Sequence, residues 1–193
     1  NPQATVHRCL LKALGLNFEI AGRNHTRLAA LAAHLGVPFR VFDADVDADN
    51  SLSGISVLLN FAGPFAYTAE VLMRACIRAG VDYLDITAEI NVYRVAERLG
   101  AEAVLQQVML LPGVGWDVVP TDALSVQVAK RVEQPFALSI ALQVPGSMSR
   151  GSAMSVSEII GAGVLARVAG ELVATPDACL LYTSPSPRDL STS

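Results

Sequence analysis

The chain has 193 residues, a formal net charge of -4, 52% hydrophobic residues and 17% charged residues. This composition predicts a packed globular core and argues against intrinsic disorder. Lys and Arg are scattered without a basic stripe, and no apolar run approaches the roughly 20 residues that cross a bilayer, so neither nucleic acid nor membrane is an expected partner.

The first part of the chain alternates helical and extended patterns. Apolar residues at helical spacing predict a helix over 6–14, which Gly15 ends. The elements expected next are a strand over 17–22, a helix over 28–35 that ends at Gly36, a strand over 39–43 and a loosely held helix or loop over 44–54.

The apolar run that begins at Val57 stops abruptly at Asn60 and turns through Gly63 and Pro64. This pattern is typical of a central parallel strand whose carboxyl end faces a ligand crevice, although a buried strand before any proline turn would also fit. The elements after it favour the first interpretation, because strands and helices keep alternating as in a doubly wound parallel α/β sheet. They are a helix over 67–79, a strand over 81–86, a helix over 92–107, a strand over 108–111 and a helix over 123–132 that Thr121 and Asp122 can cap.

The pattern changes near Glu133, after a first domain expected over 1–132. A partly alternating strand over 136–144 and an apolar helix over 154–165 predict the start of an α+β second domain over 133–178. The tail over 179–193 has prolines two apart and no periodicity, which predicts disorder. The tail also resembles translated sequencing-adapter read-through, so we assign it no function.

The cysteines and histidines predict neither a disulfide framework nor a metal site. The three cysteines are widely separated, which fits reduced thiols in a cytoplasmic protein, and Cys9 and Cys76 fall on apolar helix faces. No histidine stands at metal-ligand spacing from a cysteine or a carboxylate.

Arg23 ends the predicted strand 17–22. In a dinucleotide-binding fold this position faces the adenosine ribose, where an acidic residue would bind the 2′-hydroxyl of NAD and an Arg accommodates the 2′-phosphate of NADP. Asn24 can add a polar contact, and Asp43 can reach the adenine edge. NADP is therefore the expected cofactor, with NAD as the alternative. Arg23 as a solvated strand end and Asp43 as an ordinary strand-ending residue are the competing interpretations.

The turn after the strand at Val57 would place bare backbone and small side chains beside the pyrophosphate and the nicotinamide ribose. Here a glycine permits close approach of a ligand, and a proline stiffens the turn. The expected cofactor-contacting residues of this turn are Asn60, Ala62, Gly63, Pro64 and Phe65.

Polar residues also follow the predicted strands 81–86 and 108–111. Asp85, Glu89 and Asp117 are candidates for substrate-side acids or bases, and equally for residues that cap helices or bind backbone amides. No Ser-His-Asp or Cys-His arrangement follows from the spacing, so the catalytic residues are left open.

Four segments in order resemble the saccharopine dehydrogenase-like oxidoreductases, including the branch of trans-acting enoyl reductases. They are Ile20–Asn24, Leu59–Phe65, Tyr83–Glu89 and Leu111–Asp122, and Ser149–Ser152 fits the start of that family's second domain. The resemblance covers residues 5–170. It implies a Rossmann-type NAD(P)-binding domain and a second domain that closes over a small-molecule substrate. A homodimer through the second domain is a further expectation.

One feature of that family is missing. Its members carry a Gly-rich loop between the first strand and the first helix, where backbone amides hold the pyrophosphate. Here Asn1–Ala4 contains no glycine, and no strand precedes the first helix. We therefore expect a Rossmann-type sheet that lacks its first strand, with two inner edges unpaired, in a chain truncated at its start. We also expect the natural sequence to differ after residue 178.

The expected function is that of a cytoplasmic, NADP-preferring oxidoreductase that moves a hydride to or from a small carbonyl, imine or enoyl substrate. The chain is expected to be an inactive fragment of that enzyme. A non-catalytic nucleotide-binding sensor or scaffold of the same fold is the alternative, since fold alone does not establish function. A third interpretation is that the fragment binds nothing because its pyrophosphate loop is missing.

Overall fold

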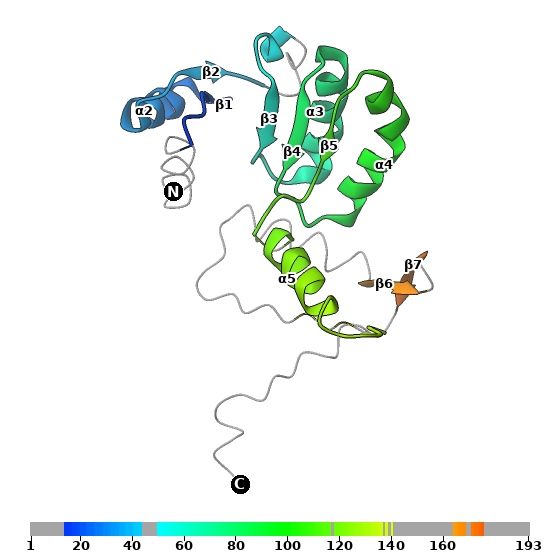
Figure 1. Cartoon of the computed structure of the whole chain (residues 1–193). Helices are drawn as coiled ribbons and strands as arrows, with labels where there is room; N and C mark the ends of the chain where they lie inside the picture. The colour runs from blue at the N-terminus through cyan, green and yellow to red at the C-terminus, as the bar shows by residue number, and fades with distance from the viewer. Residues whose placement is uncertain are drawn as a thin grey trace, which may run out of the picture. The chain divides into compact units, whose positions relative to one another are not determined.

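The computed structural model describes residues 14–43, 50–116, 118–136, 138, 140, 164–168 and 171–175. The chain divides into two compact units, Asn1–Val144 and Pro145–Ser193. The first unit contains parallel strands that alternate with helices, and the second contains a strand pair (Figure 1). The domain boundary expected at residue 132 stays a prediction.

The strands of the first unit form two parallel sheets. In one, β1 (Ile20–Gly22) pairs with β2 (Phe39–Val41). In the other, β4 (Asp82–Asp85) lies between β3 (Val57–Asn60) and β5 (Leu110–Leu111). Within the described residues no strand joins β1 to β3. The α/β class and the parallel pairing are confirmed.

The helices begin and end where local sequence signals favour it. Two of them end at Gly36 and Gly80, which adopt left-handed conformations with φ of 59° and 69° and whose amides donate to carbonyls of the last turn. The helices are α2 (His25–Leu35), α3 (Phe65–Ala79), α4 (Ile90–Leu105) and α5 (Val119–Ala129), with a short 3₁₀ helix, η1, at Asn50–Leu52. The helix predicted over 6–14 lies outside the described residues except for Leu14, which is in a turn.

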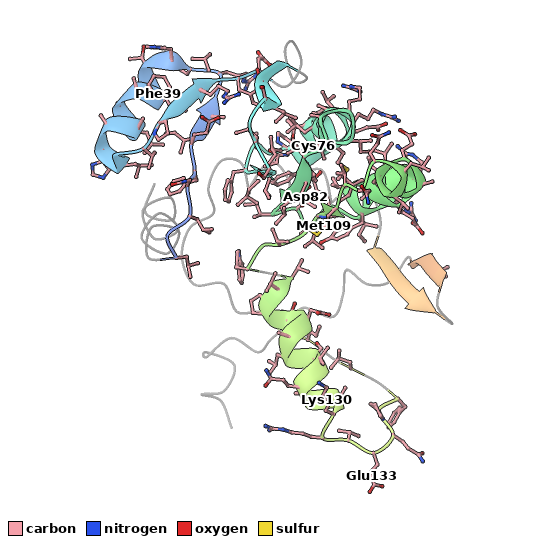
Figure 2. All side chains as sticks on the ribbon, turned by 45° about the horizontal axis from the view of Figure 1, so that its top comes forward. Phe39, Cys76, Asp82, Met109, Lys130 and Glu133 are labelled. Atoms are coloured by element: carbon pink, nitrogen blue, oxygen red, sulfur yellow. The ribbon has the colours of Figure 1, made fainter. Side chains whose placement is uncertain are left out.

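The core lies between α3, α4 and one face of the three-stranded sheet (Figure 1). Met73, Cys76 and Tyr83 are fully buried there. The opposite face of β3 is open among the described residues, since Val57 is 49% exposed and Leu59 is 41% exposed. At the amino-terminal end of these strands, the Asp82 carboxylate accepts a hydrogen bond of 2.8 Å from the Met109 amide, which connects β4 with the residue before β5 (Figure 2).

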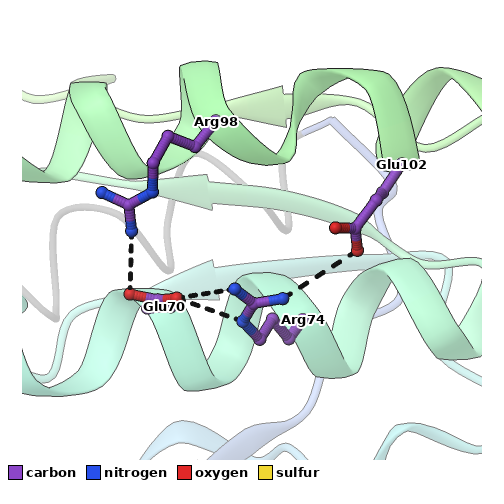
Figure 3. Close-up of polar contacts among 4 residues, drawn as sticks. All are labelled: Glu70, Arg74, Arg98 and Glu102. Carbon is purple, nitrogen blue, oxygen red and sulfur yellow. Dashed lines mark hydrogen bonds and ion pairs between the residues drawn. The ribbon is translucent and has the colours of Figure 1, made fainter.

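A network of charged side chains links α3 and α4 on their solvent side (Figure 3). Glu70 accepts hydrogen bonds from Arg74 at 2.8 Å and from Arg98 at 3.2 Å, and Arg74 also lies 3.9 Å from Glu102. Exposed pairs of this kind contribute about 0–1 kcal/mol each, so burial of the apolar faces holds the two helices together.

Three predictions near the end of the chain are wrong in part. The predicted helix over 123–132 begins earlier, at Val119, because Pro120 is well suited to the first turn of a helix. Thr121 and Asp122 therefore lie inside α5 and do not precede it as caps. Phe136, Leu138 and Ile140 have no strand structure, and the other residues of the strand predicted over 136–144 lie outside the described residues.

The second unit contains an antiparallel strand pair that the sequence reading missed. β6 (Val164–Val168) pairs with β7 (Glu171–Thr175), and Leu165 lies opposite Ala174. The helix predicted over 154–165 is thus wrong at its end, and the rest of it lies outside the described residues. The physical reason is that Val164–Val168 is a short, mostly apolar segment, which suits a strand as well as a helix until its partner strand is known.

No helix in the described part of the chain is long and apolar enough to span a membrane.

The fully buried side chain of Met73 gives a direct test of the core. We expect Met73→Ala to lower the free energy of unfolding by about 2–5 kcal/mol, because the variant loses buried apolar atoms and leaves a cavity. Val71→Ala, on the 37% exposed side of the same helix, should change it by less than about 1 kcal/mol. Urea denaturation followed by circular dichroism measures both, and equal losses would contradict the assignment of the buried face.

Cys76 gives a pH-dependent test of the same core. Burial, with a smaller contribution from the charge of Asp82, raises the pKa of the Cys76 thiol to about 12. Iodoacetamide should therefore alkylate Cys76 slowly in the folded protein at alkaline pH. The free energy of unfolding should fall as the pH rises above about 8.5, where the thiol of the unfolded chain ionises. Iodoacetamide labelling of the Cys9→Ser, Cys179→Ser double variant, folded and in urea, checks this; equal rates would refute it.

Candidate active site

The carboxyl ends of the parallel strands β3, β4 and β5 lie at one edge of the sheet, where α/β folds bind their ligands. Asn60, the last residue of β3, is in register with Asp85, the last residue of β4. The buried polar side chains of the described residues all lie at this edge or just beyond it, and they are Asn60, Asp85, Thr87 and Glu89. We call these four residues, together with Tyr83, the polar cluster.

Asp85 is the centre of the polar cluster and is fully buried. Its Oδ2 accepts a hydrogen bond of 2.8 Å from the Tyr83 hydroxyl. Its Oδ1 accepts hydrogen bonds from the backbone amides of Thr87 at 2.9 Å and Gly113 at 3.0 Å. Of the two roles that the sequence left open for Asp85, the structure thus shows the binding of backbone amides. This carboxylate holds the segments after β4 and β5 together.

Glu89 connects the segment after β4 to the beginning of α3. Its carboxylate accepts hydrogen bonds from the amides of Phe65 at 3.2 Å and Ala66 at 2.8 Å. These are two of the amides that an α-helix leaves without a partner in its first turn, where negative charge is favourable. Glu89 therefore caps α3 from a distant part of the sequence, and Pro64, the residue before the helix, contributes no side-chain cap.

Asn60 shapes the turn after β3. Its Oδ1 accepts a hydrogen bond of 2.8 Å from the Ala62 amide, and its Nδ2 donates to Thr68 Oγ1 and to the Tyr83 hydroxyl, both at 3.2 Å. Thr68 in turn donates to the Ala62 carbonyl at 2.7 Å. Held from beneath in this way, Ala62 and Gly63 are exposed, and the Gly63–Pro64 peptide bond is cis.

The residues expected at the nicotinamide end thus fall into two groups. Ala62 and Gly63 present exposed surface, and Pro64 is half-buried. Asn60 is buried beneath the turn, and Phe65 places its ring in the core while its amide binds Glu89. Contact of each of these residues with a cofactor stays a prediction.

The residues expected at the adenosine end lie after β1 and β2. Arg23 is exposed, and within the described residues its guanidinium forms no hydrogen bond or ion pair. Asn24 accepts a hydrogen bond of 3.0 Å from the Arg27 amide and so caps α2. Asp43 is half-buried just beyond β2. A guanidinium that is free beside the start of a helix fits a phosphate, which is the group that distinguishes NADP from NAD.

Tyr83 was not singled out from the sequence, although its hydroxyl connects Asn60 with Asp85 in the polar cluster. Burial raises the pKa of its hydroxyl far above the ordinary value, and the nearby charge of Asp85 raises it further. The hydroxyl therefore remains protonated and donates to Asp85. The available signal was the alternation of β4, since Tyr83 and Asp85 are two apart and share the buried face of the strand.

Among the described residues no group of three or more His, Cys, Asp or Glu side chains could hold a metal ion. Asp117 lies outside the described residues.

Gly113 provides a test of how tightly the turn after β5 is packed. Its φ is 80°, and a Cβ at this position would overlap the ring and hydroxyl of Tyr93, which donates to the Thr87 carbonyl at 3.3 Å. Gly54 has a similar φ of 78° but faces open space. We expect Gly54→Ala to cost about 1–2 kcal/mol of stability, and Gly113→Ala about 1–3 kcal/mol more because of the overlap. Urea denaturation of both variants checks this, and similar losses would show that the turn yields freely.

Comparisons with known proteins place this arrangement in a family. The chain matches the family model of the saccharopine dehydrogenase NADP binding domain over residues 3–109. A solved structure, apo saccharopine dehydrogenase (L-Glu forming) from Saccharomyces cerevisiae, aligns with a TM-score of 0.54 at 19% identity and covers 61% of this chain and 26% of that one. At this identity the structure supports the fold alone.

Two curated relatives share part of the sequence. A trans-acting enoyl reductase of Mycobacterium leprae is 30% identical over 136 residues, which are 66% of this chain and 32% of the relative. A lipid droplet localized protein of Caenorhabditis elegans is 26% identical over 120 residues, which are 56% of this chain and 28% of the relative. The chain thus spans about a third of these relatives or less. The family model, however, covers more than half of this chain, and the chain belongs to the saccharopine dehydrogenase NADP-binding domain family.

Proposed function

We propose that this chain is the cofactor-binding part of an NADP-preferring oxidoreductase that moves a hydride to or from a small carbonyl, imine or enoyl group. The comparisons establish membership of the saccharopine dehydrogenase NADP-binding domain family. The name of the Mycobacterium relative supports an oxidoreductase. The preference for NADP, the substrate class and the status of the chain as a fragment are the proposal. The guanidinium of Arg23, which is exposed and forms no hydrogen bond or ion pair among the described residues, is the observation that carries the preference for NADP.

The described residues suit the two ends of a dinucleotide differently. Arg23 would hold the 2′-phosphate through charge-assisted hydrogen bonds, with Asn24 and Asp43 nearby at the ends of β1 and β2. The exposed backbone at Ala62 and Gly63 would lie along the nicotinamide half. When bound, the cofactor supplies hydride chemistry, and the protein supplies orientation and exclusion of water.

The substrate class rests on weaker support. The Mycobacterium relative is named an enoyl reductase, which supports an enoyl group among the proposed substrates. A cytoplasmic location, a homodimer through the second domain and the inactivity of this chain by itself remain proposals.

Replacing Arg23 tests the cofactor preference. We expect Arg23→Ala to weaken NADPH binding by about tenfold or more and to leave NADH binding nearly unchanged, because only NADPH carries the phosphate. Arg94→Ala removes another exposed arginine, in α4, and should change neither affinity. Isothermal titration calorimetry measures all of these values. Equal weakening of both cofactors by Arg23→Ala would defeat the proposed role.

Titrations of two versions of the chain test whether the pyrophosphate loop is missing. NADPH and NADH are titrated into the chain as printed and into a version with a strand and a Gly-rich loop added ahead of Val6. Tighter NADPH binding by the extended version would support a fragment whose pyrophosphate loop is missing. No binding to either folded version would defeat the proposed function.

Turnover separates the enzyme from the alternative of a sensor or scaffold. Consumption of NADPH with small carbonyl, imine and enoyl compounds, followed in the whole enzyme, would support the oxidoreductase. Binding of NADPH with no consumption across these compounds would favour the sensor.

A further inference from the structure

A continuous chain of hydrogen bonds connects the turn after β3 with the turn after β5. It begins at the Ala62 amide and reaches the Tyr83 hydroxyl through the side chain of Asn60. It continues from Tyr83 to the Asp85 carboxylate and ends at the Gly113 amide. The two backbone ends belong to different turns, of which Ala62 is exposed and Gly113 is buried, and the three side chains between them are buried.

The direction of every bond in this chain is fixed. A backbone amide can only donate, so the Asn60 oxygen faces Ala62 and the Asn60 nitrogen faces Tyr83. The Tyr83 hydroxyl accepts a hydrogen bond from that nitrogen and must therefore donate its own hydrogen bond to the side chain at position 85. The side chain at position 85 also accepts a hydrogen bond from the Gly113 amide. A carboxylate, which accepts at both oxygens, satisfies all of these donors, whereas an Asn side chain would set a donor against one of them.

The cluster is also sealed from solvent. Tyr83 and Asp85 are 0% exposed, and Asn60 is 4% exposed. A hydrogen bond that is lost inside the cluster is therefore not replaced by bulk water, and a defect in one bond strains its neighbours.

We propose that Tyr83 and Asp85 are positioning residues that couple the cofactor-side turn at 61–64 to the substrate-side turn at 112–115. Binding of a nicotinamide cofactor against Ala62 and Gly63 would then set the geometry of the turn at Gly113. The cofactor part of this inference rests on the proposed function, and the coupling between the two turns does not.

The coupling is tested first without ligand, by hydrogen exchange of single amides in NMR spectra of the chain as printed. We expect Tyr83→Phe to speed exchange of both the Ala62 and the Gly113 amides by about fivefold, although the hydroxyl contacts neither. The amide of Met73, in the core of α3, is the internal reference for global stability and should change less. Tyr67→Phe, which removes the hydroxyl of a residue that is 69% exposed on the same unit, is the matched control and should change none of them.

Asp85→Asn extends the test across the network. It should speed exchange at Gly113 directly and at Ala62 remotely, and the remote effect should vanish when Tyr83→Phe is also present. A remote effect that persists in the double variant, or a Tyr83→Phe variant that alters neither amide, would overturn the proposal. If Asp85→Asn does not fold, the Tyr83→Phe result decides the matter.

NADPH supplies the second arm. In the unaltered chain we expect saturating NADPH to shift the Gly113 amide resonance, and in Tyr83→Phe we expect NADPH to bind while that shift is lost. An identical shift in both proteins would refute the transmission through Tyr83. Failure of NADPH to bind the unaltered chain and its extended version would defeat the proposed function, and the ligand-free exchange would still decide whether the two turns are coupled.

Discussion

The edge of the sheet where β3, β4 and β5 end depends on the hydrogen bonds that the buried carboxylate of Asp85 accepts. Three parallel strands end at this edge, and each is followed by a turn whose backbone amides need acceptors. Asp85 accepts from the amides of Thr87 and Gly113 and from the Tyr83 hydroxyl, so one side chain satisfies donors from two strand ends. Removing it would leave several buried donors without partners, a far larger disturbance than the loss of an exposed charge.

This arrangement separates the surface that a ligand can touch from the groups that hold that surface in place. Ala62 and Gly63 are exposed and chemically plain. Beneath them, Asn60 binds the turn and Thr68 closes it through the Ala62 carbonyl. Polar residues at the end of a strand therefore need not face a ligand, and here the most polar of them serve as internal supports.

The sequence predicts the fold better than it predicts the site, for a physical reason. Glycines such as Gly36 and Gly80 end helices through a local backbone conformation, so their neighbours suffice to identify them. Whether Asp85 faces a ligand or a backbone amide depends on Gly113, which is distant in sequence. The capping of α3 by Glu89 is equally non-local. The error at Leu165 arose because a short apolar segment fits a helix and a hairpin equally well until its partner strand, β7, is known.

The cap that Glu89 places on α3 affects where an anion can bind at the starts of the helices. A helix start with free amides attracts phosphate wherever it lies, and a protein that binds a cofactor with several phosphates risks capturing it in the wrong register. Because Glu89 occupies the amides of Phe65 and Ala66, these two amides are not available to a phosphate. After β1, the guanidinium of Arg23 forms no hydrogen bond or ion pair among the described residues, so it is available to an anion. The start of α2 and the start of α3 thus differ in what they offer an anion, an available guanidinium at one and occupied amides at the other.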